Sequence, residues 1–193
     1  PPGGSGRQHY LTAITRLDKR IVEIIDVEKI LAEISPYNTH LSDTVYDQGL
    51  IAKVKNRRIL LVDDSMVAIE QMKQVLTPMG LQIAEARNGL DAWNLLMHWK
   101  QIGVNFDRDL MMVITDAEMP EMDGYMLTTE IRRDPELKNL IVVLHTSLSG
   151  NFNKAMVEKV GCNGFLSKFA PEAMAAEVQR LMRLRLENLG EWP

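Results

Sequence analysis

From residue 59 onward, short apolar runs alternate with apolar positions at helical spacing. The runs are Ile59–Val62, Leu81–Ala84, Leu110–Ile114, Leu140–Leu144 and Gly164–Leu166. Most of them are almost unbroken, which is typical of strands that are covered on both faces. The helical faces are Ala68/Ile69/Met72/Val75/Met79, Ala92/Leu95/Leu96/Trp99, Leu127/Ile131, Phe152/Ala155/Met156/Val160 and Met174/Val178/Leu181/Met182. Five β–α repeats predict an α/β fold, a doubly wound five-stranded parallel sheet with helices on both faces.

The N-terminal part of the chain has a weaker pattern. Tyr10–Ile25 predicts two β-strands joined at Leu17–Arg20. Asp26 is in position to cap a short helix that Pro36 ends, with an apolar face formed by Val27, Ile30, Leu31 and Ile34. One small β-hairpin with one helix cannot bury a core of its own, so we expect this piece to pack on something else.

These patterns predict four parts. Residues 1–6, Pro-Pro-Gly-Gly-Ser-Gly, are a flexible lead or an expression remnant, and because the chain does not begin with Met we expect the natural N-terminus to lie further upstream. Residues 7–35 form the hairpin and helix fragment. In residues 36–57 the apolar residues are no longer regularly spaced, and we expect this segment to be a linker with some local structure. Residues 58–190 form the α/β domain.

Composition narrows the class of protein. The 193 residues are 46% hydrophobic and 25% charged, which is typical of a globular protein. Without a signal peptide or an apolar run of roughly 18–20 residues, the chain is expected to be cytoplasmic and not inserted in a membrane. The single cysteine, Cys162, excludes an internal disulfide and a cysteine-rich zinc site. A net charge of −4 disfavours nucleic acid as a partner.

Polar residues that can do chemistry follow four of the predicted strands. Asp63 and Asp64 follow the first strand, Asp116 the third, Thr146 the fourth and Lys168 the fifth. Parallel α/β sheets bind ligands at the carboxyl ends of their strands. Two unit charges about 4 Å apart repel by roughly 4 kcal/mol at an effective dielectric constant near 20, so clustered carboxylates need a cation. A hard ion with oxygen ligands meets this need, and Mg²⁺ fits best because it also keeps sites for a phosphate.

This arrangement predicts phosphoryl transfer. Asp116 is the expected nucleophile, because its strand is flanked by those that bring the other groups. Asp63 and Asp64 are expected to hold the metal together with Asp116 and the backbone carbonyl of Glu118. Thr146 and Lys168 would bind phosphoryl oxygens. Taken singly, each residue also has a structural interpretation, as a helix cap, a turn residue, a strand-end hydroxyl or a surface lysine.

Several motifs within Ile59–Arg183 resemble the receiver domain of bacterial response regulators. They are Ile-Leu-Leu-Val-Asp-Asp-Ser (59–65), Ala-Arg-Asn-Gly (86–89), Ile-Thr-Asp-Ala-Glu-Met-Pro-Glu-Met-Asp-Gly (114–124), His-Thr-Ser (145–147) and Gly-Phe-Leu-Ser-Lys (164–168). Thr146 lies 30 positions and Lys168 52 positions after Asp116, as in that family. The resemblance implies a flavodoxin-like fold with strand order 2-1-3-4-5.

The same resemblance implies how the domain works. Members of the family bind Mg²⁺ and take a phosphoryl group from a phosphohistidine of a partner kinase, on the position that matches Asp116. They transmit the change through the positions of Thr146 and Phe165. The expected protein is therefore not an enzyme, apart from its own phosphorylation and dephosphorylation. One departure is that Phe169 follows Lys168, where the family usually has proline.

The segment Leu11–Ile34 resembles the end of the chemotaxis coupling (CheW-like) domain. Together with a receiver domain directly downstream, it resembles the CheV family of hybrid coupling proteins. The resemblance implies a cytoplasmic adaptor, associated with receptor arrays, that modulates receptor–kinase coupling or acts as a phosphate sink. Its partners would be a chemotaxis histidine kinase and, through the coupling domain, chemoreceptors. The apolar strands of the hairpin also suggest a homodimer.

Two other classes of protein compete with this interpretation. A stand-alone or DNA-binding response regulator shares the receiver motifs, but about twenty residues follow Pro171, too few for a DNA-reading domain. A phosphatase of the haloacid-dehalogenase type also uses a strand-end aspartate and Mg²⁺. Its chemistry needs a second aspartate two positions after the first, where this chain has Ser65 after Asp63.

Overall fold

The computed structural model describes residues 11–18, 20–25, 30, 41–146, 160–168 and 170–192. The chain divides into two compact units, Pro1–Asn38 and Thr39–Pro193. In the first unit, β1 (Leu11–Leu17) and β2 (Arg20–Ile25) form an antiparallel hairpin, which confirms the predicted strands. Of the helix predicted after Asp26, Ile30 is described and is helical, and the rest lies outside the described residues.

The second unit contains a five-stranded parallel sheet. Its strands are β3 (Arg58–Val62), β4 (Gln82–Ala86), β5 (Leu110–Asp116), β6 (Ile141–Thr146) and β7 (Gly164–Ser167). They lie in the order β4-β3-β5-β6-β7, so the predicted 2-1-3-4-5 topology is confirmed. Every residue of β5 and β6 is buried, which explains their unbroken apolar runs. The edge strand β4 is only partly buried, and its sequence is accordingly mixed.

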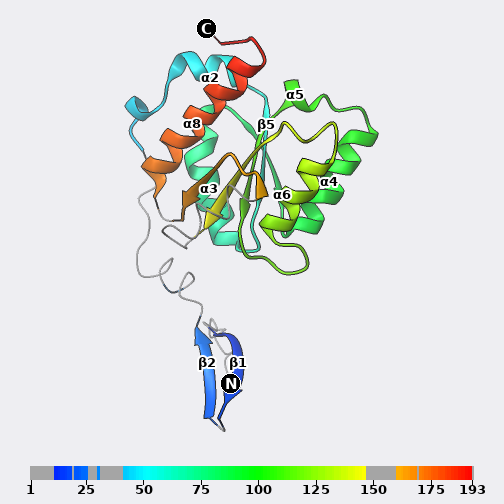
Figure 1. Cartoon of the computed structure of the whole chain (residues 1–193). Helices are drawn as coiled ribbons and strands as arrows, with labels where there is room; N and C mark the ends of the chain where they lie inside the picture. The colour runs from blue at the N-terminus through cyan, green and yellow to red at the C-terminus, as the bar shows by residue number, and fades with distance from the viewer. Residues whose placement is uncertain are drawn as a thin grey trace, which may run out of the picture. The chain divides into compact units, whose positions relative to one another are not determined.

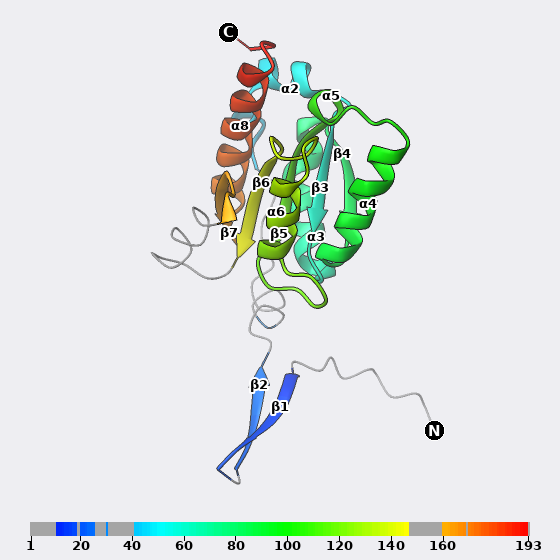
Figure 2. The ribbon, with the colours of Figure 1, turned by 45° about the vertical axis from the view of Figure 1, so that its right-hand side comes forward.

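Helices cover both faces of the sheet (Figures 1 and 2). They are α3 (Met66–Leu76), continued by the 3₁₀ turn η2 (Thr77–Met79), α4 (Gly89–Gln101), α5 (Phe106–Asp109), α6 (Gly124–Arg133) and α8 (Pro171–Asn188). The apolar sides of α3 and α8 share one buried cluster with β3, β5 and β6. The apolar sides of α4 and α6 share a second buried cluster. None of the helices within the described residues combines the length and apolar character needed to span a membrane.

The segment that the sequence predicted as a linker, residues 36–57, contains a packed helix. After the 3₁₀ turn η1 (Asp43–Val45), Asp47 caps α2 (Gln48–Val54) by accepting hydrogen bonds from the first-turn N–H groups. Leu50 and Val54 of α2 have no exposed surface and belong to the cluster under α3 and α8. The apolar pattern does not reveal this helix, because seven residues are too few for a repeated helical period.

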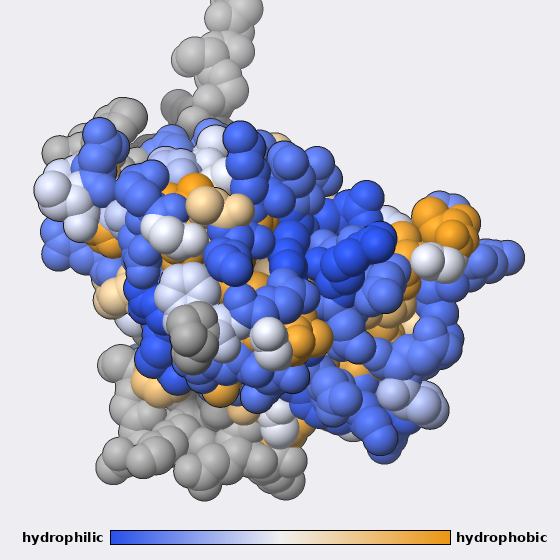
Figure 3. Space-filling model, turned by 90° about the horizontal axis from the view of Figure 1, so that it is seen from above, coloured by the Kyte–Doolittle hydropathy of each residue, from blue (hydrophilic) through white to orange (hydrophobic). Residues whose placement is uncertain are grey.

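The face seen from above in Figure 3 lies at the end of the second unit where α2, α5 and the C-terminal end of α8 meet. It is mostly hydrophilic, with scattered apolar patches. Because parallel strands begin at this end, the acidic residues predicted at the strand ends lie at the opposite edge of the sheet. The face in Figure 3 and the acidic residues therefore lie at opposite edges of the sheet.

Candidate functional site

The carboxyl ends of four neighbouring strands bring the predicted site residues to one edge of the sheet. Asp63 and Asp64 directly follow β3, Asp116 ends β5, Thr146 ends β6 and Lys168 directly follows β7. These strands are neighbours in the order β3-β5-β6-β7. Residues that are far apart in the sequence are thus brought together by the pairing of the strands, as expected for a parallel α/β fold.

Three carboxylates form the centre of this acidic site. One oxygen from each of Asp63, Asp64 and Asp116 lies within 4.8 Å of the others. Asp63 is fully buried and Asp116 is 7% exposed, whereas Asp64 reaches solvent. Two negative groups have therefore been withdrawn from water next to a third, which is unfavourable unless cations compensate for them.

Lys168 supplies one of these cations. Its Nζ lies 3.4 Å from Oδ2 of Asp63 and 3.2 Å from Oδ2 of Asp116, and the residue is 6% exposed. Its backbone N–H donates to the carbonyl of Thr146 at 3.0 Å, which holds the end of β7 against the end of β6. With three carboxylates and one ammonium, the site keeps an excess of two negative charges.

Backbone N–H groups hold the other carboxylate oxygens. Oδ1 of Asp63 accepts from the N–H of Ser65 at 2.9 Å, and Oδ1 of Asp116 accepts from the N–H of Ala117 at 2.8 Å. Ser65 in turn caps α3 by accepting from the N–H of Ala68. The turn that starts α3 thus orients Asp63, whereas the residue that caps α3 is Ser65 and neither Asp63 nor Asp64. In both carboxylates Oδ2 faces Lys168.

The remaining predicted residues surround this centre. Thr146 is 3% exposed at the end of β6. Glu118 lies in the loop after β5, where its backbone carbonyl is the predicted metal ligand. Phe165 lies on β7, pairs in register with Leu144 and is 42% exposed.

Two residues near the site were not singled out by the sequence. His145 is buried, and its Nδ1 lies 3.8 Å from Oδ2 of Asp63. Its register position opposite Asp116 places it beside the site. Gly124 begins α6, where an added Cβ would lie 2.0 Å from the carbonyl oxygen of Asp116. The loop after β5 can therefore fold back on Asp116 only with glycine at this position.

The field of the acidic site reaches the first turn of α6. Burial raises the pKa of Tyr125, and Glu118, Cys162, Asp123 and Asp116 raise it further, because each disfavours a second negative charge nearby. The local potential is therefore negative, which favours a cation at this edge of the sheet.

The fold and the position of the acidic site define a class of protein. The family model of the response regulator receiver domain matches residues 59–179, and the chain belongs to this family. A signal receiver domain of a histidine kinase from Syntrophus aciditrophicus has a similar structure, with a TM-score of 0.55 and 31% identity over 65% of this chain and 89% of that one. The chemotaxis response regulator CheY4 of Vibrio cholerae gives a TM-score of 0.56 and 26% identity over 66% of this chain and 99% of its own.

A longer similarity extends beyond the receiver domain. The chain is 29% identical to chemotaxis protein CheV1 of Helicobacter pylori over 188 residues, which is 96% of this chain and 55% of CheV1. The predicted resemblance to the CheV family is confirmed at this level. The chain spans about half the length of this curated relative. The identification of residues 7–35 as the end of a CheW-like domain stays a prediction.

Proposed function

We propose that this chain is the phosphoacceptor part of a chemotaxis signalling adaptor, with Asp116 as the residue that takes up the phosphoryl group. The observation that carries the proposal is the position of Lys168, whose Nζ lies between buried oxygens of Asp63 and Asp116 in a cluster of three carboxylates. Structural ion pairs do not need a third, exposed carboxylate such as Asp64 beside them. A site that binds a metal ion together with charged phosphoryl oxygens does need such an additional carboxylate.

In the proposed transfer, one bond to phosphorus forms and one bond to phosphorus breaks. A carboxylate oxygen of Asp116 attacks the phosphorus of a phosphohistidine, the P–N bond breaks, and the imidazole leaves with its electron pair and takes up a proton. The product is an acyl phosphate on Asp116. Lys168, already 3.2 Å from Oδ2 of this carboxylate, is in position to neutralise one phosphoryl oxygen, and the hydroxyl of Thr146 would donate to another.

The donor set fits Mg²⁺. Asp63, Asp64 and Asp116 supply carboxylate oxygens, and the backbone carbonyl of Glu118 would complete the protein's ligands. Such all-oxygen sites suit a hard divalent ion that keeps water ligands open to phosphate. When bound, Mg²⁺ would neutralise the two excess negative charges and the charge that develops on the phosphoryl oxygens.

A small phosphodonor tests the assignment of Asp116. The 193-residue chain is incubated with acetyl phosphate and Mg²⁺, and the gain of one PO₃ group is measured by intact-protein mass spectrometry. We expect Asp116→Asn to abolish this gain. Glu118→Gln is the matched control, because it removes a nearby carboxylate and keeps the backbone carbonyl, so it should be phosphorylated normally. Undiminished phosphorylation of Asp116→Asn would refute the assignment.

The proposed donor is a chemotaxis histidine kinase, and the proposed output is altered coupling of chemoreceptors to this kinase or removal of phosphate from it. Support comes from the similarity to CheV1 along almost the whole chain. Phosphorylation adds negative charge beside Thr146, so β6 and the half-exposed Phe165 on β7 are the proposed route of the change. In this proposal the chain catalyses nothing beyond its own phosphorylation and dephosphorylation.

A phosphotransfer experiment tests the donor. The chemotaxis kinase of the source organism is phosphorylated with labelled ATP, and the label is followed to this chain with and without EDTA. We expect rapid transfer that needs Mg²⁺ and Asp116. Transfer that is no faster than from an unrelated histidine kinase would show that the chemotaxis assignment is wrong, even if acetyl phosphate modifies Asp116.

A further inference from the structure

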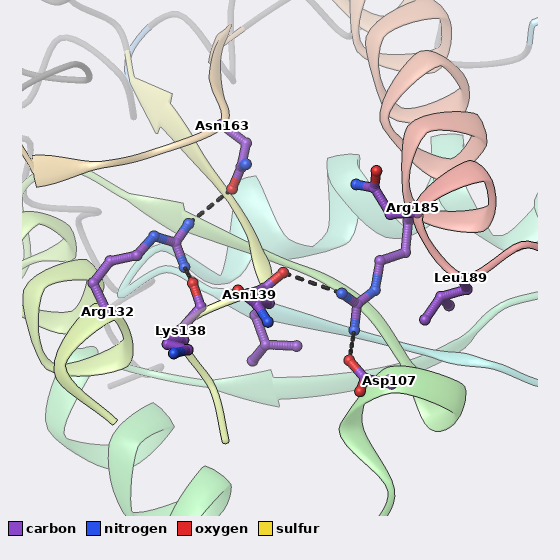
Figure 4. Close-up of a pocket in the computed structure, with 9 residues that line it drawn as sticks. Asp107, Arg132, Lys138, Asn139, Asn163, Arg185 and Leu189 are labelled. Carbon is purple, nitrogen blue, oxygen red and sulfur yellow. Dashed lines mark hydrogen bonds and ion pairs between the residues drawn. The ribbon is translucent and has the colours of Figure 1, made fainter. Parts of the chain in front are cut away.

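A second hollow lies at the opposite edge of the sheet, where β5, β6 and β7 begin (Figure 4). Its volume is about 460 Å³, within the range of roughly 300–1,000 Å³ that small-molecule sites occupy. The walls come from α5, the end of α6, the turns before β6 and β7, and the C-terminal end of α8. The described lining residues are Asp107, Arg132, Lys138, Asn139, Leu140, Asn163, Arg185, Asn188 and Leu189.

The lining of this hollow is positively charged. Three cationic side chains, Arg132, Lys138 and Arg185, face a single carboxylate, Asp107, among the described lining residues. The excess of two positive charges occurs in a chain whose net charge is −4. Local charge of this sign and size favours an anionic ligand.

The guanidinium of Arg132 forms its hydrogen bonds with uncharged groups. Its guanidinium donates to three uncharged oxygens, the carbonyl of Gly161 at 2.8 Å, the carbonyl of Lys138 at 3.1 Å and Oδ1 of Asn163 at 2.8 Å. Burial lowers the pKa of Arg132, because the cation has lost part of its hydration. Lys138 forms no ion pair within the described residues. An anion in the hollow would compensate both charges.

Arg185 makes the far wall of the hollow rigid. It is 3% exposed and reaches from α8 to the carbonyls of Asn139 at 3.1 Å and Phe106 at 3.2 Å and to Oδ1 of Asp107 at 2.9 Å. The side chain of Asp107 is 65% exposed, so water weakens the effect of this carboxylate on the cations of the hollow. Figure 4 shows Arg132 directed toward Asn163 and Lys138, and Arg185 directed toward Asn139 and Asp107.

We propose that this hollow binds a small sugar phosphate. Arginine and lysine cations are common partners of phosphate oxygens, and the guanidinium of Arg132, fixed by three hydrogen bonds, and the exposed residue Lys138 line the same hollow. The side-chain amides of Asn139, Asn163 and Asn188 can pair with sugar hydroxyls. The apolar lining among the described residues is limited to Leu140 and Leu189, with no aromatic ring on which a nucleobase would stack. The proposal does not rest on the proposed function.

Titration calorimetry with ribose 5-phosphate tests the site. The 193-residue chain is used with EDTA, so that a metal cannot hold the phosphate at the acidic site. We expect a Kd of about 1 mM or tighter and about tenfold weaker binding by Lys138→Gln, because one charge-assisted contact is lost. Arg133→Gln is the matched control. Arg133 follows Arg132 on α6 but pairs with Glu130 and does not line the hollow.

Three further measurements complete the test. Arg132→Lys keeps the charge but loses the hydrogen bonds that hold Gly161, Lys138 and Asn163 around the hollow, and it should weaken binding as Lys138→Gln does. Neutral ribose should bind at least tenfold more weakly than ribose 5-phosphate, because the phosphate contributes the charge-assisted contacts. Far-UV circular dichroism checks that the exposed Lys138→Gln variant is folded. No binding at about 10 mM ribose 5-phosphate, equal affinity of Lys138→Gln and Arg133→Gln, or equal affinity for ribose would each overturn the proposal.

Discussion

Asp63 has no exposed surface, so its charge depends on the groups that the fold places around it. Lys168 provides the nearest full positive charge, at 3.4 Å from Oδ2, and the N–H of Ser65 holds Oδ1. A buried carboxylate that keeps both partners is tolerated, but removing either partner leaves an uncompensated charge at a cost of several kcal/mol. Substitution of Lys168 is therefore a poor test of phosphorylation, since it also changes the stability of the fold.

Asp64 offers a cleaner test, because it is exposed and lies within 4.8 Å of the two buried carboxylates. We expect Asp64→Asn to raise the free energy of unfolding without Mg²⁺ by up to about 1 kcal/mol, since a repulsive exposed charge is removed. The same change should reduce the stabilisation that added Mg²⁺ gives, because a ligand of the proposed metal is lost. Urea unfolding with Mg²⁺ and with EDTA measures both effects.

Glu118→Gln is the control for this prediction, since it also removes a carboxylate but keeps the proposed backbone ligand. It should be stabilised by Mg²⁺ as strongly as the unchanged chain. If Asp64→Asn responds to Mg²⁺ as strongly as Glu118→Gln, the metal does not bind at the three aspartates.

Gly124 fixes the distance between α6 and Asp116. We expect Gly124→Ala to destabilise the chain by about 1–3 kcal/mol or more, because its Cβ would lie 2.0 Å from the carbonyl oxygen of Asp116 and the backbone must move. Gly49→Ala, in the first turn of α2, should change stability by less than about 1 kcal/mol, since its nearest neighbour is a side-chain oxygen at 3.3 Å. Urea unfolding compares the two. An equal loss of unfolding free energy in Gly124→Ala and Gly49→Ala would contradict this account of the loop after β5.

At the scale of the elements, α2 is attached to α8 by a group of polar contacts. Oδ2 of Asp47, the cap of α2, accepts from Arg183 at 2.8 Å. The buried Gln179 accepts from the N–H of Asp47 at 2.7 Å and donates to the carbonyl of Val45 at 3.1 Å. A helix of seven residues is not stable in isolation, so these contacts and its buried leucine and valine hold it in place.

The attachment predicts a pH dependence. The hydrogen bond from Arg183 lowers the pKa of Asp47, and the N–H groups of Leu50 and Gly49 lower it further. The ion pair therefore stabilises the fold above the unfolded pKa of about 3.9, and this contribution is lost as the pH falls through the lower folded pKa. We expect Arg183→Gln to cost less than about 1 kcal/mol at pH 7, because both side chains are about one third exposed. The cost should shrink as the pH falls below the unfolded pKa and through the lower folded pKa of Asp47.

A double-mutant cycle makes this prediction specific. In an Asp47→Asn background, Arg183→Gln should cost nothing further, since its partner is already gone. Arg180→Gln, on the same helix, removes an ion pair with Glu177 and should cost the same in both backgrounds. Urea unfolding between pH 3 and pH 7 measures all variants. If Arg183→Gln costs as much in the Asp47→Asn background as in the unchanged chain, the ion pair does not attach α2.

The elements differ in how far the sequence could predict them, for physical reasons. β5 and β6 are buried along their whole length, so their composition alone identifies them, and the residues at their ends could be placed at one edge. The sequence did not predict α2, because this helix is stabilised by packing against α3 and α8, which are distant in sequence. The short distance from His145 to Asp63 depends on strand register, which the sequence alone does not show. The hollow beside Arg132 is lined by five parts of the fold that are separated in the sequence, so no local sequence pattern reveals it.

At the scale of the molecule, one strand connects the two edges of the sheet. β6 starts at the basic hollow, where the N–H of Val142 donates to Oδ1 of Asn163, the oxygen that also accepts from Arg132. It ends at Thr146 in the acidic site. A phosphoryl group at one end and a sugar phosphate at the other would both act on the position of this strand. Because coupling of two sites is reciprocal, the affinity for ribose 5-phosphate should then differ between phosphorylated and unphosphorylated chains.

The two compact units predict where the chain can be divided. A chain of residues 39–193 should keep the free energy of unfolding of the second unit, because it retains α2 with the whole sheet. A chain of residues 57–193 contains all of the receiver strands but lacks Leu50 and Val54, each fully buried. Losing each of these side chains costs about 1.5–3 kcal/mol, and the hydrogen bond from Tyr46 to the carbonyl of Val75 is lost as well.

Urea unfolding of the two shortened chains and the 193-residue chain, followed by tryptophan fluorescence, measures the difference. We expect the transition of residues 39–193 to coincide with that of the receiver in the longer chain, and that of residues 57–193 to lie at clearly lower urea. Acetyl phosphate should modify Asp116 in residues 39–193 at the normal rate, since every residue of the acidic site is kept. Equal stability of the two shortened chains would mean that α2 is a linker after all, and that the receiver core is complete without it.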